Sequence, residues 1–369
     1  MVFIQANREA ILKSLMTVTG IVENRHTMPI LANVLISKVG EEVSFLASDA
    51  DIQIRTTASI GVGEESVGTT VSALKIREIL KALPEDSKVS MRIDDRKATI
   101  SACRSRFSLQ TLSDADFPTL AAVEDWPVSL TVTQQQLRQL FQSVSYAMAI
   151  KDVRFYLNGL LLQTDGETLR SVATDAHRLA CSEIRIPEAR LPSLEVVLPR
   201  KSVIELQRLL SDTDDPVSID ISARQIRLRF NDIEFISKLV DGKYPDYGRV
   251  IPTHHRNRLH IDREALAAAL SRASILTSEK LRGVRMTVEP SSLRIQSTNG
   301  EQEEAYEEVE TDYEGETFEV GFNINYLQDV LAYLKSETIR IELGSANSSA
   351  LITVPERDDF KYVVMPMRM

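Results

Sequence analysis

The sequence predicts an α+β protein built from three similar domains in tandem, each with two helices packed on antiparallel sheets. Amphipathic helical segments recur in pairs along the chain, and alternating runs of apolar and polar residues separate them. The matching segments lie close to 123 residues apart, which is one third of the 369-residue chain. Self-similarity at a fixed spacing of this kind indicates repeated folding units.

An amphipathic segment opens each third of the chain. Apolar residues fall at three- and four-residue steps in segments 8–15, 135–141 and 263–270. A second such segment follows in mid-repeat, at 75–83, 201–210 and 326–334. Equivalent residues recur at near-constant offsets, as shown by the apolar set Ile11, Leu137 and Leu266 and by the acidic set Glu78, Glu205 and Asp329. Each segment is therefore predicted to be a helix with one buried face.

Period-two alternation between the helices predicts strands. It is clearest in segments 219–222, 226–230 and 339–343. Short turns such as 94–96 separate neighbouring runs, which favours antiparallel hairpins. A pair of adjacent polar residues suited to a turn recurs between strands, at Ser48-Asp49, Thr174-Asp175 and Thr298-Asn299. Each third is thus predicted to run helix, strands, helix, strands.

Proline and polar residues interrupt the pattern near 125–128 and 252–257. They place the predicted domains at 1–126, 127–255 and 256–369. Two cysteines, Cys103 and Cys181, cannot supply a disulfide framework or a zinc site. Because no apolar run approaches the ~18 residues of a membrane-spanning helix, we expect a cytoplasmic protein.

Charge is distributed unevenly along the chain. The net charge of −10 and a pI near 5.2 argue on average against nucleic-acid binding. The six helical segments with their flanking residues nevertheless carry a net +6, which leaves −16 for the remainder; the ranges counted are 7–18, 72–83, 134–148, 199–211, 262–276 and 323–336. Their outward basic residues fit either a phosphate backbone or an ordinary solvated surface: Lys13, Lys75, Arg77, Lys81, Arg138, Arg200, Lys201 and Arg208.

Segment 301–319 holds ten acidic residues and no basic one, and its apolar positions fit a strand with an acidic face. The first domain offers a basic and apolar strand at 104–109. These two segments lie far apart in one chain, so contact between two copies in a closed symmetric ring uses both.

The sequence contains no P-loop, G-x-S-x-G, H-E-x-x-H or G-x-G-x-x-G pattern. The only acid or histidine clusters are Asp49 with Asp51 and Asp175 with His177, and real metal sites need three or four converging ligands. A turn-forming role is favoured over catalysis, and we expect no enzyme activity, cofactor or metal. The C-terminal segment 362–369 is unusually apolar and suits an adaptable surface for peptide partners.

Several ordered motifs give the chain a close resemblance to the bacterial sliding clamps, the β subunits of DNA polymerase III. They include segments 28–33, 103–109, 152–159, 173–179, 237–242, 279–285 and the terminal Val-Val-Met-Pro-Met-Arg. The resemblance implies three clamp domains per chain and a head-to-tail homodimer whose six domains form a ring around duplex DNA. It also implies tethering of a polymerase without sequence readout.

The resemblance implies three sets of site residues. DNA contacts would come from Arg25, Lys75, Lys151, Phe155, Tyr156, Arg200 and Lys201. The dimer interface would use Arg104, Arg106, Phe107 and Leu109 against Ile275, Leu276, Glu301, Glu303 and Glu304. A pocket for partner peptides would be built from Leu157, Thr174, His177, Arg178, Leu179, Pro245, Arg249, Val250, Asn323, Tyr326, Ser349, Val363, Val364, Met365, Pro366, Met367 and Arg368.

The partners implied are double-stranded DNA, a second copy, the replicative polymerase, the clamp loader, and other polymerases and repair proteins with clamp-binding peptides. The chain departs from the family pattern at Ala176, Gly248 and Leu281, which bears on the shape of the pocket. Two alternatives stay open at this stage. One is a nuclease using Asp49, Asp51, Asp175 and His177, and the other is a non-replicative interaction scaffold.

Overall fold

The structure is a computed structural model of the chain, and it describes the residues outside 24–27, 95, 279–281, 356 and 369. Arg25 and Leu281 therefore lie outside the described residues. The chain forms two compact units. The first contains Met1–Leu137 and Ile204–Leu239, and the second contains Arg138–Val203 and Val240–Met369.

The same order of elements occurs three times: strand, helix, four strands, helix, three strands. The first set is β1 Val2–Asn7, α1 Arg8–Val18, β2 Asn33–Val39, β3 Glu42–Ser48, β4 Ile52–Ser59, β5 Val67–Ser72, α2 Ala73–Ala82, β6 Lys88–Asp94, β7 Lys97–Ala102 and β8 Ser105–Leu112. The second is β9 Val128–Thr133, α3 Gln134–Gln142, β10 Gly159–Gly166, β11 Thr168–Thr174, β12 Arg178–Arg185, β13 Leu191–Pro199, α4 Arg200–Leu209, β14 Pro216–Ile221, β15 Gln225–Phe230 and β16 Ile233–Lys238. The third is β17 Asn257–Asp262, α5 Arg263–Ala273, β18 Gly283–Glu289, β19 Ser292–Thr298, β20 Glu304–Glu310, β21 Phe318–Asn323, α6 Ile324–Tyr333, β22 Thr338–Leu343, β23 Ala350–Val354 and β24 Arg357–Val364.

All six predicted helices are present, but the predicted order of elements was wrong at the start of each third. A six-residue strand precedes the first helix each time, at β1, β9 and β17. Alternation is visible in β9, where Val128, Leu130 and Val132 are buried and the residues between them face outward. The partners of these strands lie far along the chain, as in the pairing of β9 with β14, so local pattern alone left them undetected.

Every strand pairing in the three sheets is antiparallel, as predicted. The first unit contains a 12-stranded sheet, in which β4 pairs with β16 and so joins strands of the first and second thirds. The second unit contains an eight-stranded sheet, in which β12 pairs with β24 and joins the second and third thirds. It also contains a four-stranded sheet with the order β20-β19-β18-β21.

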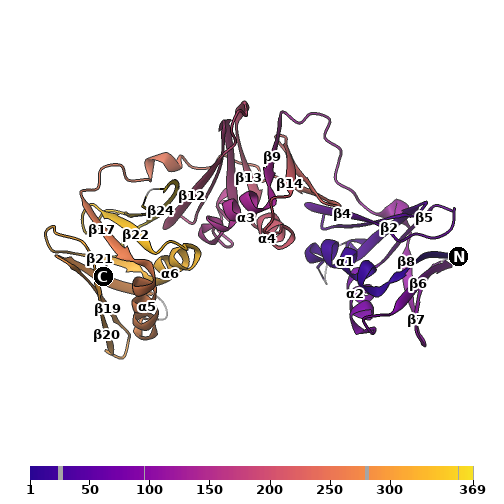
Figure 1. Cartoon of the computed structure of the whole chain (residues 1–369), viewed down its shortest axis with the longest axis horizontal. Coiled ribbons are helices and arrows are strands. Elements are labelled where there is room, and N and C mark those ends of the chain that lie inside the picture. The colour runs from indigo at the N-terminus through magenta and orange to yellow at the C-terminus, as the bar shows by residue number, and fades with distance from the viewer. Residues whose placement is uncertain (24–27, 95, 279–281, 356, 369) are drawn as a thin grey trace. The chain divides into compact units, whose positions relative to one another are not determined.

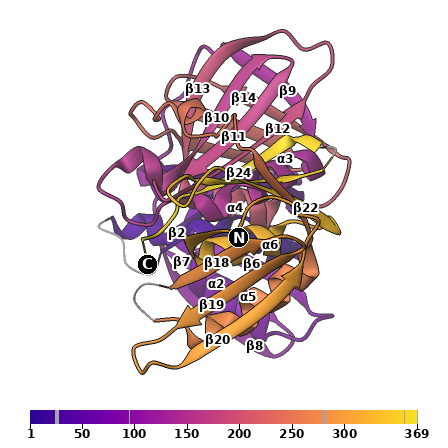
Figure 2. The same ribbon diagram turned by 90° about the vertical axis from the view of Figure 1, so that its left-hand side faces the viewer.

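Helices cover one face of the sheets in each unit. In the first unit, α1 packs against α2 and buries Ile11, Leu15 and Val18 (Figure 1). In the second unit, α5 packs against α6 and against β19 and β20, and Figure 2 shows these strands beside α5. Burying one apolar stripe leaves the opposite face of each helix to carry its charged residues.

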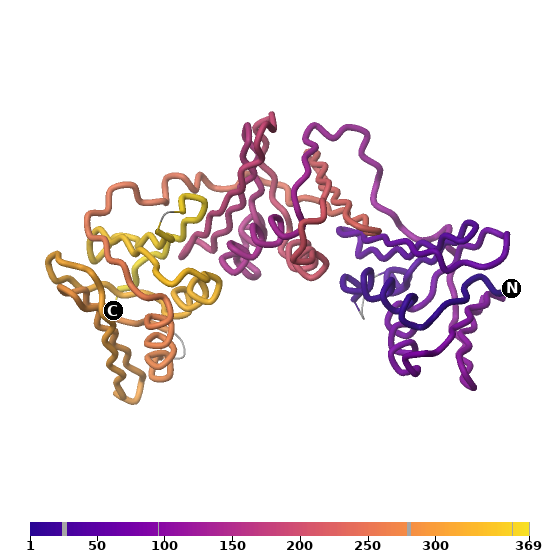
Figure 3. The backbone as a smooth tube through the Cα atoms, viewed as in Figure 1, coloured from indigo at the N-terminus to yellow at the C-terminus, as the bar shows by residue number. Residues whose placement is uncertain are grey.

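Two connecting segments contain no helix or strand longer than one 3₁₀ turn. The first runs from residue 117 to 127, and the second from 240 to 256 around the 3₁₀ turn Tyr247–Arg249 (Figure 3). The predicted boundaries at 126/127 and 255/256 lie in or beside these segments, and they stay predictions. Among the described residues, no helix combines the length and apolar character needed to cross a membrane.

Candidate functional site

The three polar residue pairs that the sequence predicts as turns, Ser48-Asp49, Thr174-Asp175 and Thr298-Asn299, form turns at equivalent places in the three repeats. In each, a side-chain oxygen accepts two backbone N–H groups two to four residues ahead: Asp49 Oδ1 from Asp51 and Ile52, Asp175 Oδ1 from His177 and Arg178, and Asn299 Oδ1 from Glu301 and Glu303. In the middle turn, Ala176 has a φ of 74°. This left-handed conformation favours glycine, which explains why the family pattern has a glycine at the position where this chain has Ala176.

The acidic residues considered for catalysis are held by these turns. Asp175 also accepts a hydrogen bond from Nε of Arg178 at 3.1 Å. Across the described part of the chain, no three His, Cys, Asp or Glu side chains gather as metal ligands would. Asp49 and Asp175 therefore act as turn-forming residues.

An apolar cluster lies on the eight-stranded sheet of the second unit. Leu179 of β12 and Val363 of β24 are fully buried there, and Val250 of the connecting segment packs against them. Tyr244, also on this segment, accepts a hydrogen bond from the backbone N–H of Thr174 at 3.1 Å. Burial raises the pKa of the Tyr244 hydroxyl well above its usual range. The segment is thus fixed over the cluster.

The C-terminal tail lies at the rim of this cluster. The N–H of Met365 donates to the carbonyl of His177 at 2.8 Å, and the N–H of Met367 donates to the carbonyl of Gly321 at 2.7 Å. The rings of His177 and Tyr326 stack with their centroids 6.5 Å apart. A cavity of about 710 Å³ adjoins the tail and is lined by Pro366, Met367 and Arg368 together with Arg285, Glu319, Val320, Gly321, Ala346 and Asn347.

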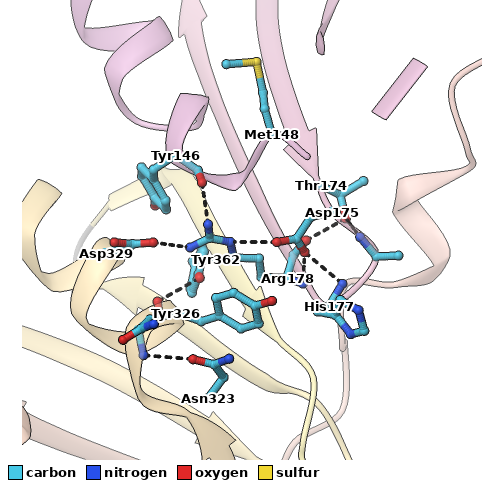
Figure 4. A network of polar contacts seen from close by, with 12 residues as sticks. Tyr146, Met148, Thr174, Asp175, His177, Arg178, Asn323, Tyr326, Asp329 and Tyr362 are labelled. Atoms are coloured by element: carbon cyan, nitrogen blue, oxygen red, sulfur yellow. Dashed lines mark hydrogen bonds and ion pairs between the residues drawn. The ribbon is translucent and has the colours of Figure 1, made fainter. Parts of the chain in front are cut away.

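Arg178 is the centre of a polar network between the turn at 174–179 and helix α6, which lie on opposite sides of this rim (Figure 4). Its guanidinium contacts Asp175, Asp329 and the carbonyl of Tyr146, and only 10% of its side chain is exposed. Burial by itself lowers the pKa of Arg178, but the nearby Tyr362 and the hydrogen bond to Asp329 outweigh it and raise that pKa. The guanidinium is therefore a fixed positive charge.

The residues predicted for the pocket come together in the second unit, and their roles stay predictions. Those buried are Leu157, Thr174, Leu179, Val363 and Val364. Those half-buried are Arg178, Val250, Asn323, Tyr326, Ser349, Pro366 and Met367. Those exposed are His177, Pro245, Arg249, Met365 and Arg368. Asn323 also caps α6 through the N–H of Asn325, and Arg249 pairs with Asp246.

The residues predicted to contact DNA differ in accessibility. Lys75 on α2 and Lys151 are exposed, and Phe155 is 74% exposed. Tyr156 and Lys201 are half-buried. Arg200 is also half-buried and donates to the carbonyl of Met148 at 3.3 Å, so its guanidinium is partly committed to this chain.

The residues predicted for the dimer interface lie on exposed strands and turns. In β8 and the turn before it, Arg104 and Arg106 are exposed, while Phe107 and Leu109 are half-buried. Ile275 is 77% exposed, an unusual state for an isoleucine, and Leu276 is half-buried. The acidic residues Glu301, Glu303 and Glu304 are exposed at the start of β20.

Four residues that position this site were not predicted for it: Tyr146, Tyr244, Tyr247 and Asp329. The hydroxyl of Tyr247 donates to Oε1 of Gln163 at 2.7 Å, which anchors the connecting segment to the sheet. Asp329 was noted only as a recurring acidic position. Its partner Arg178 lies 151 residues away, so no local signal could have linked them.

Comparison with known proteins gives a consistent result along the chain. Models of the N-terminal, central and C-terminal domains of the DNA polymerase III beta subunit match residues 1–121, 131–246 and 248–368. A beta sliding clamp from Pseudomonas putida is 44% identical over 364 residues, 98% of each chain.

Solved structures agree with this result. The DNA polymerase III subunit beta of Pseudomonas aeruginosa matches with a TM-score of 0.95 and 43% identity, covering 100% of both chains. A sliding clamp from the same species bound to griselimycin matches with a TM-score of 0.95 and 42% identity, again covering 100% of both chains. This chain therefore belongs to the family of bacterial DNA polymerase III beta subunits, the beta sliding clamps.

Proposed function

We propose that two copies of this chain close into a ring around duplex DNA and hold a DNA polymerase on its template. The family is that of the non-catalytic processivity factor of DNA polymerase III. The observation that supports the ring is a pattern of strand pairing. The pattern occurs twice within the chain, and the first and third repeats each leave one of its strands without the equivalent partner.

The fourth strand of one repeat pairs with the last strand of the next. Thus β4 pairs with β16, and β12 pairs with β24. The equivalent strand of the third repeat, β20, is at the edge of its sheet. The last strand of the first repeat, β8, pairs with β5 only near Leu112. Pairing β20 of one copy with β8 of the other would complete the pattern head to tail and close the ring.

The two internal junctions also give an expected register. Phe235 lies opposite Ile54 in the first junction, and Tyr362 lies opposite Ala180 in the second. Both aromatic residues are fully buried. Phe107 is their counterpart in the first repeat, and it is only half-buried in a single chain. By analogy it would lie opposite Ala305 of the second copy, beside the exposed Ile275.

Charge complementarity supports this register. Opposite residues across antiparallel strands share a face, so Arg106 would face Tyr306 of the second copy. Glu304 and Glu308 occupy the flanking positions on that face of β20. A basic strand would then meet an acidic one, which disfavours pairing of either strand with itself.

The exposed lysines of the helices fit non-specific contact with phosphates. Such contacts weaken steeply with salt because DNA binding releases condensed counterions. A closed ring is retained on DNA by topology, which salt does not screen. The residue-level DNA contacts proposed are Arg25, Lys75, Lys151, Phe155, Tyr156, Arg200 and Lys201.

Retention on circular and linear DNA tests the ring directly. We expect the protein, once placed on nicked circular DNA by its clamp loader, to survive a wash with 0.5 M salt (roughly a 4 Å screening length). It should be lost when the DNA is cut once with a restriction enzyme. Equal loss from circular and linear DNA would contradict encirclement. Failure to stimulate processive synthesis, with griselimycin still bound, would favour a non-replicative scaffold.

We also infer that partner proteins dock a peptide segment on the apolar cluster and its rim, next to the C-terminal tail. Buried leucine and valine side chains supply an apolar floor, and Met365 and Met367 supply an adaptable wall. The relative from P. aeruginosa was solved bound to griselimycin, which supports a ligand site in this fold. The replicative polymerase, the clamp loader and other replication and repair proteins are the partners proposed.

A further inference from the structure

The walls of the proposed pocket come from two clamp domains. The second domain supplies the turn 174–179, which links β11 to β12. The third domain supplies the start of α6, with Asn323 and Tyr326, and the C-terminal tail. A pocket between two domains can bind a peptide well only if the distance between its walls is fixed in advance, because ordering them on binding costs affinity.

Arg178 joins these two walls through three separate segments (Figure 4). Nε donates to Asp175 in its own turn at 3.1 Å, and Nη2 donates to the carbonyl of Tyr146 at 2.6 Å. Nη1 donates to Asp329 of α6 at 2.5 Å. The guanidinium also lies 4.5 Å from the centre of the Tyr326 ring. The positive charge of Arg178 is thus neutralised by the carboxylates of Asp175 and Asp329 in this chain.

Asp329 is the member of this network that ties α6 to the second domain. It follows Tyr326 by three residues, so both side chains lie on one face of the helix. Tyr326 in turn stacks on His177 across the pocket rim. The ion pair with Arg178 therefore fixes how far α6 lies from the turn and how it is rotated about its axis.

Arg178 is the sheltered member of this ion pair. Its side chain is 10% exposed and lies against the rings of Tyr146 and Tyr326, whereas the side chain of Asp329 is 43% exposed. Solvent screens the pair in part from the Asp329 side, but loss of Asp329 would leave the sheltered guanidinium less completely neutralised. Without Asp329, Arg178 would keep its contacts within the second domain and, on α6, the contact with the ring of Tyr326.

We propose that Asp329 is a positioning residue for peptide binding, which sets the separation of the two pocket walls through Arg178. Asp329 is not among the residues that the family resemblance assigns to the pocket. The inference rests on the peptide pocket proposed above, and it adds that affinity depends on a residue that lies behind the pocket wall.

The test compares the affinity of griselimycin for four forms of the full chain by isothermal titration calorimetry. Asp329→Asn keeps the size of the side chain and removes its charge, and we expect binding about three- to tenfold weaker than wild type. Asp329→Glu restores the charge and should recover most of that loss. Tyr333→Phe is the matched control, because it removes a hydrogen bond from the same helix to the carbonyl of Gln139. It should leave the affinity unchanged.

The possible outcomes separate this inference from the proposed pocket. If wild-type protein does not bind griselimycin, the pocket itself is wrong. If wild type binds and Asp329→Asn binds equally well, the positioning role is overturned while the pocket stands. Equal weakening by Tyr333→Phe and Asp329→Asn, or no recovery with Asp329→Glu, would show general loosening of α6 and would also overturn the role.

Discussion

Left-handed backbone at non-glycine residues identifies the tightest points of the repeated turns. Ala50 has a φ of 77°, Ala176 of 74° and Gln302 of 65°. An L-residue with a Cβ atom adopts this conformation at a cost, which the side-chain hydrogen bonds of Asp49, Asp175 and Asn299 offset in each turn. The three turns therefore share the side-chain hydrogen bonding, while the left-handed residue directly follows the aspartate in the first two and lies three residues after Asn299 in the third.

Replacing Ala176 by glycine should stabilise the fold. Glycine adopts a positive φ without steric penalty, and we expect a gain of about 1 kcal/mol in the free energy of unfolding, seen as a higher thermal midpoint by calorimetry. Ala268→Gly, at an exposed position within α5, is the control and should lower the midpoint, since glycine costs about 1 kcal/mol within a helix. A lower midpoint for Ala176→Gly would contradict the argument.

Cys181 gives a pH-dependent test of the apolar cluster. Burial raises the pKa of its thiol from 9.0 to about 11. Between these values the unfolded chain loses the thiol proton while the folded chain keeps it, so stability should fall as pH rises above 9. At pH 8, we expect a thiol reagent to leave Cys181 unmodified in the folded protein and to modify it in urea, as read by mass spectrometry. Rapid modification in the folded state would refute this burial.

The C-terminal tail is an element whose place depends on two backbone hydrogen bonds. Met365 binds the carbonyl of His177, and Met367 binds the carbonyl of Gly321. The preceding residues Val363 and Val364 are fully buried in β24. Deleting the tail would therefore remove these two hydrogen bonds and leave the residues of β24 in the chain.

Deleting the residues after Val364 should weaken griselimycin binding at least about tenfold, because an adaptable apolar wall of the pocket is lost. The dimer should persist in analytical ultracentrifugation, since none of the proposed interface residues is deleted. Arg357→Gln, at the other end of β24, is a control that should keep the affinity of the full chain. Unchanged griselimycin affinity in the truncated chain would disprove a role for the tail.

At the scale of the whole molecule, the proposed ring uses β20, which is at the edge of its sheet, and β8, which pairs with β5 only near Leu112. Phe107 is half-buried, although its counterparts Phe235 and Tyr362 in the internal junctions are fully buried, and Ile275 is 77% exposed. In the proposed ring the side chains of Phe107 and Ile275 would pack together beneath the pairing of β8 with β20.

Phe107→Ala should raise the dissociation constant of the dimer at least about tenfold, since a buried aromatic at the centre of an interface is typically worth about 2 kcal/mol or more. Sedimentation equilibrium would measure the change. Phe155→Ala is the matched control, because that ring is also exposed but lies outside the proposed interface. Equal dimer stability in wild type and Phe107→Ala would argue against the proposed register.

Local periodicity and turn chemistry were sufficient to predict the repeated helices and hairpins. The apolar stripe of 8–15 is the buried face of α1, and Asp175 forms the predicted turn. The opening strands were missed because each is only six residues long and is stabilised by a distant partner, as β1 is by β6. Six residues of alternation, as in β9, are too few to identify a strand when a helix follows directly.

By itself the sequence determined that the chain has three α+β repeats, that its helical segments together carry a net positive charge, and that it resembles the sliding clamps. These features follow from spacing and composition, which are local or periodic. Only the tertiary structure decided that strands pair across the repeats and that Arg178 meets Asp329 from 151 residues away. Such contacts depend on where packed sheets bring remote side chains, and no local pattern encodes that distance.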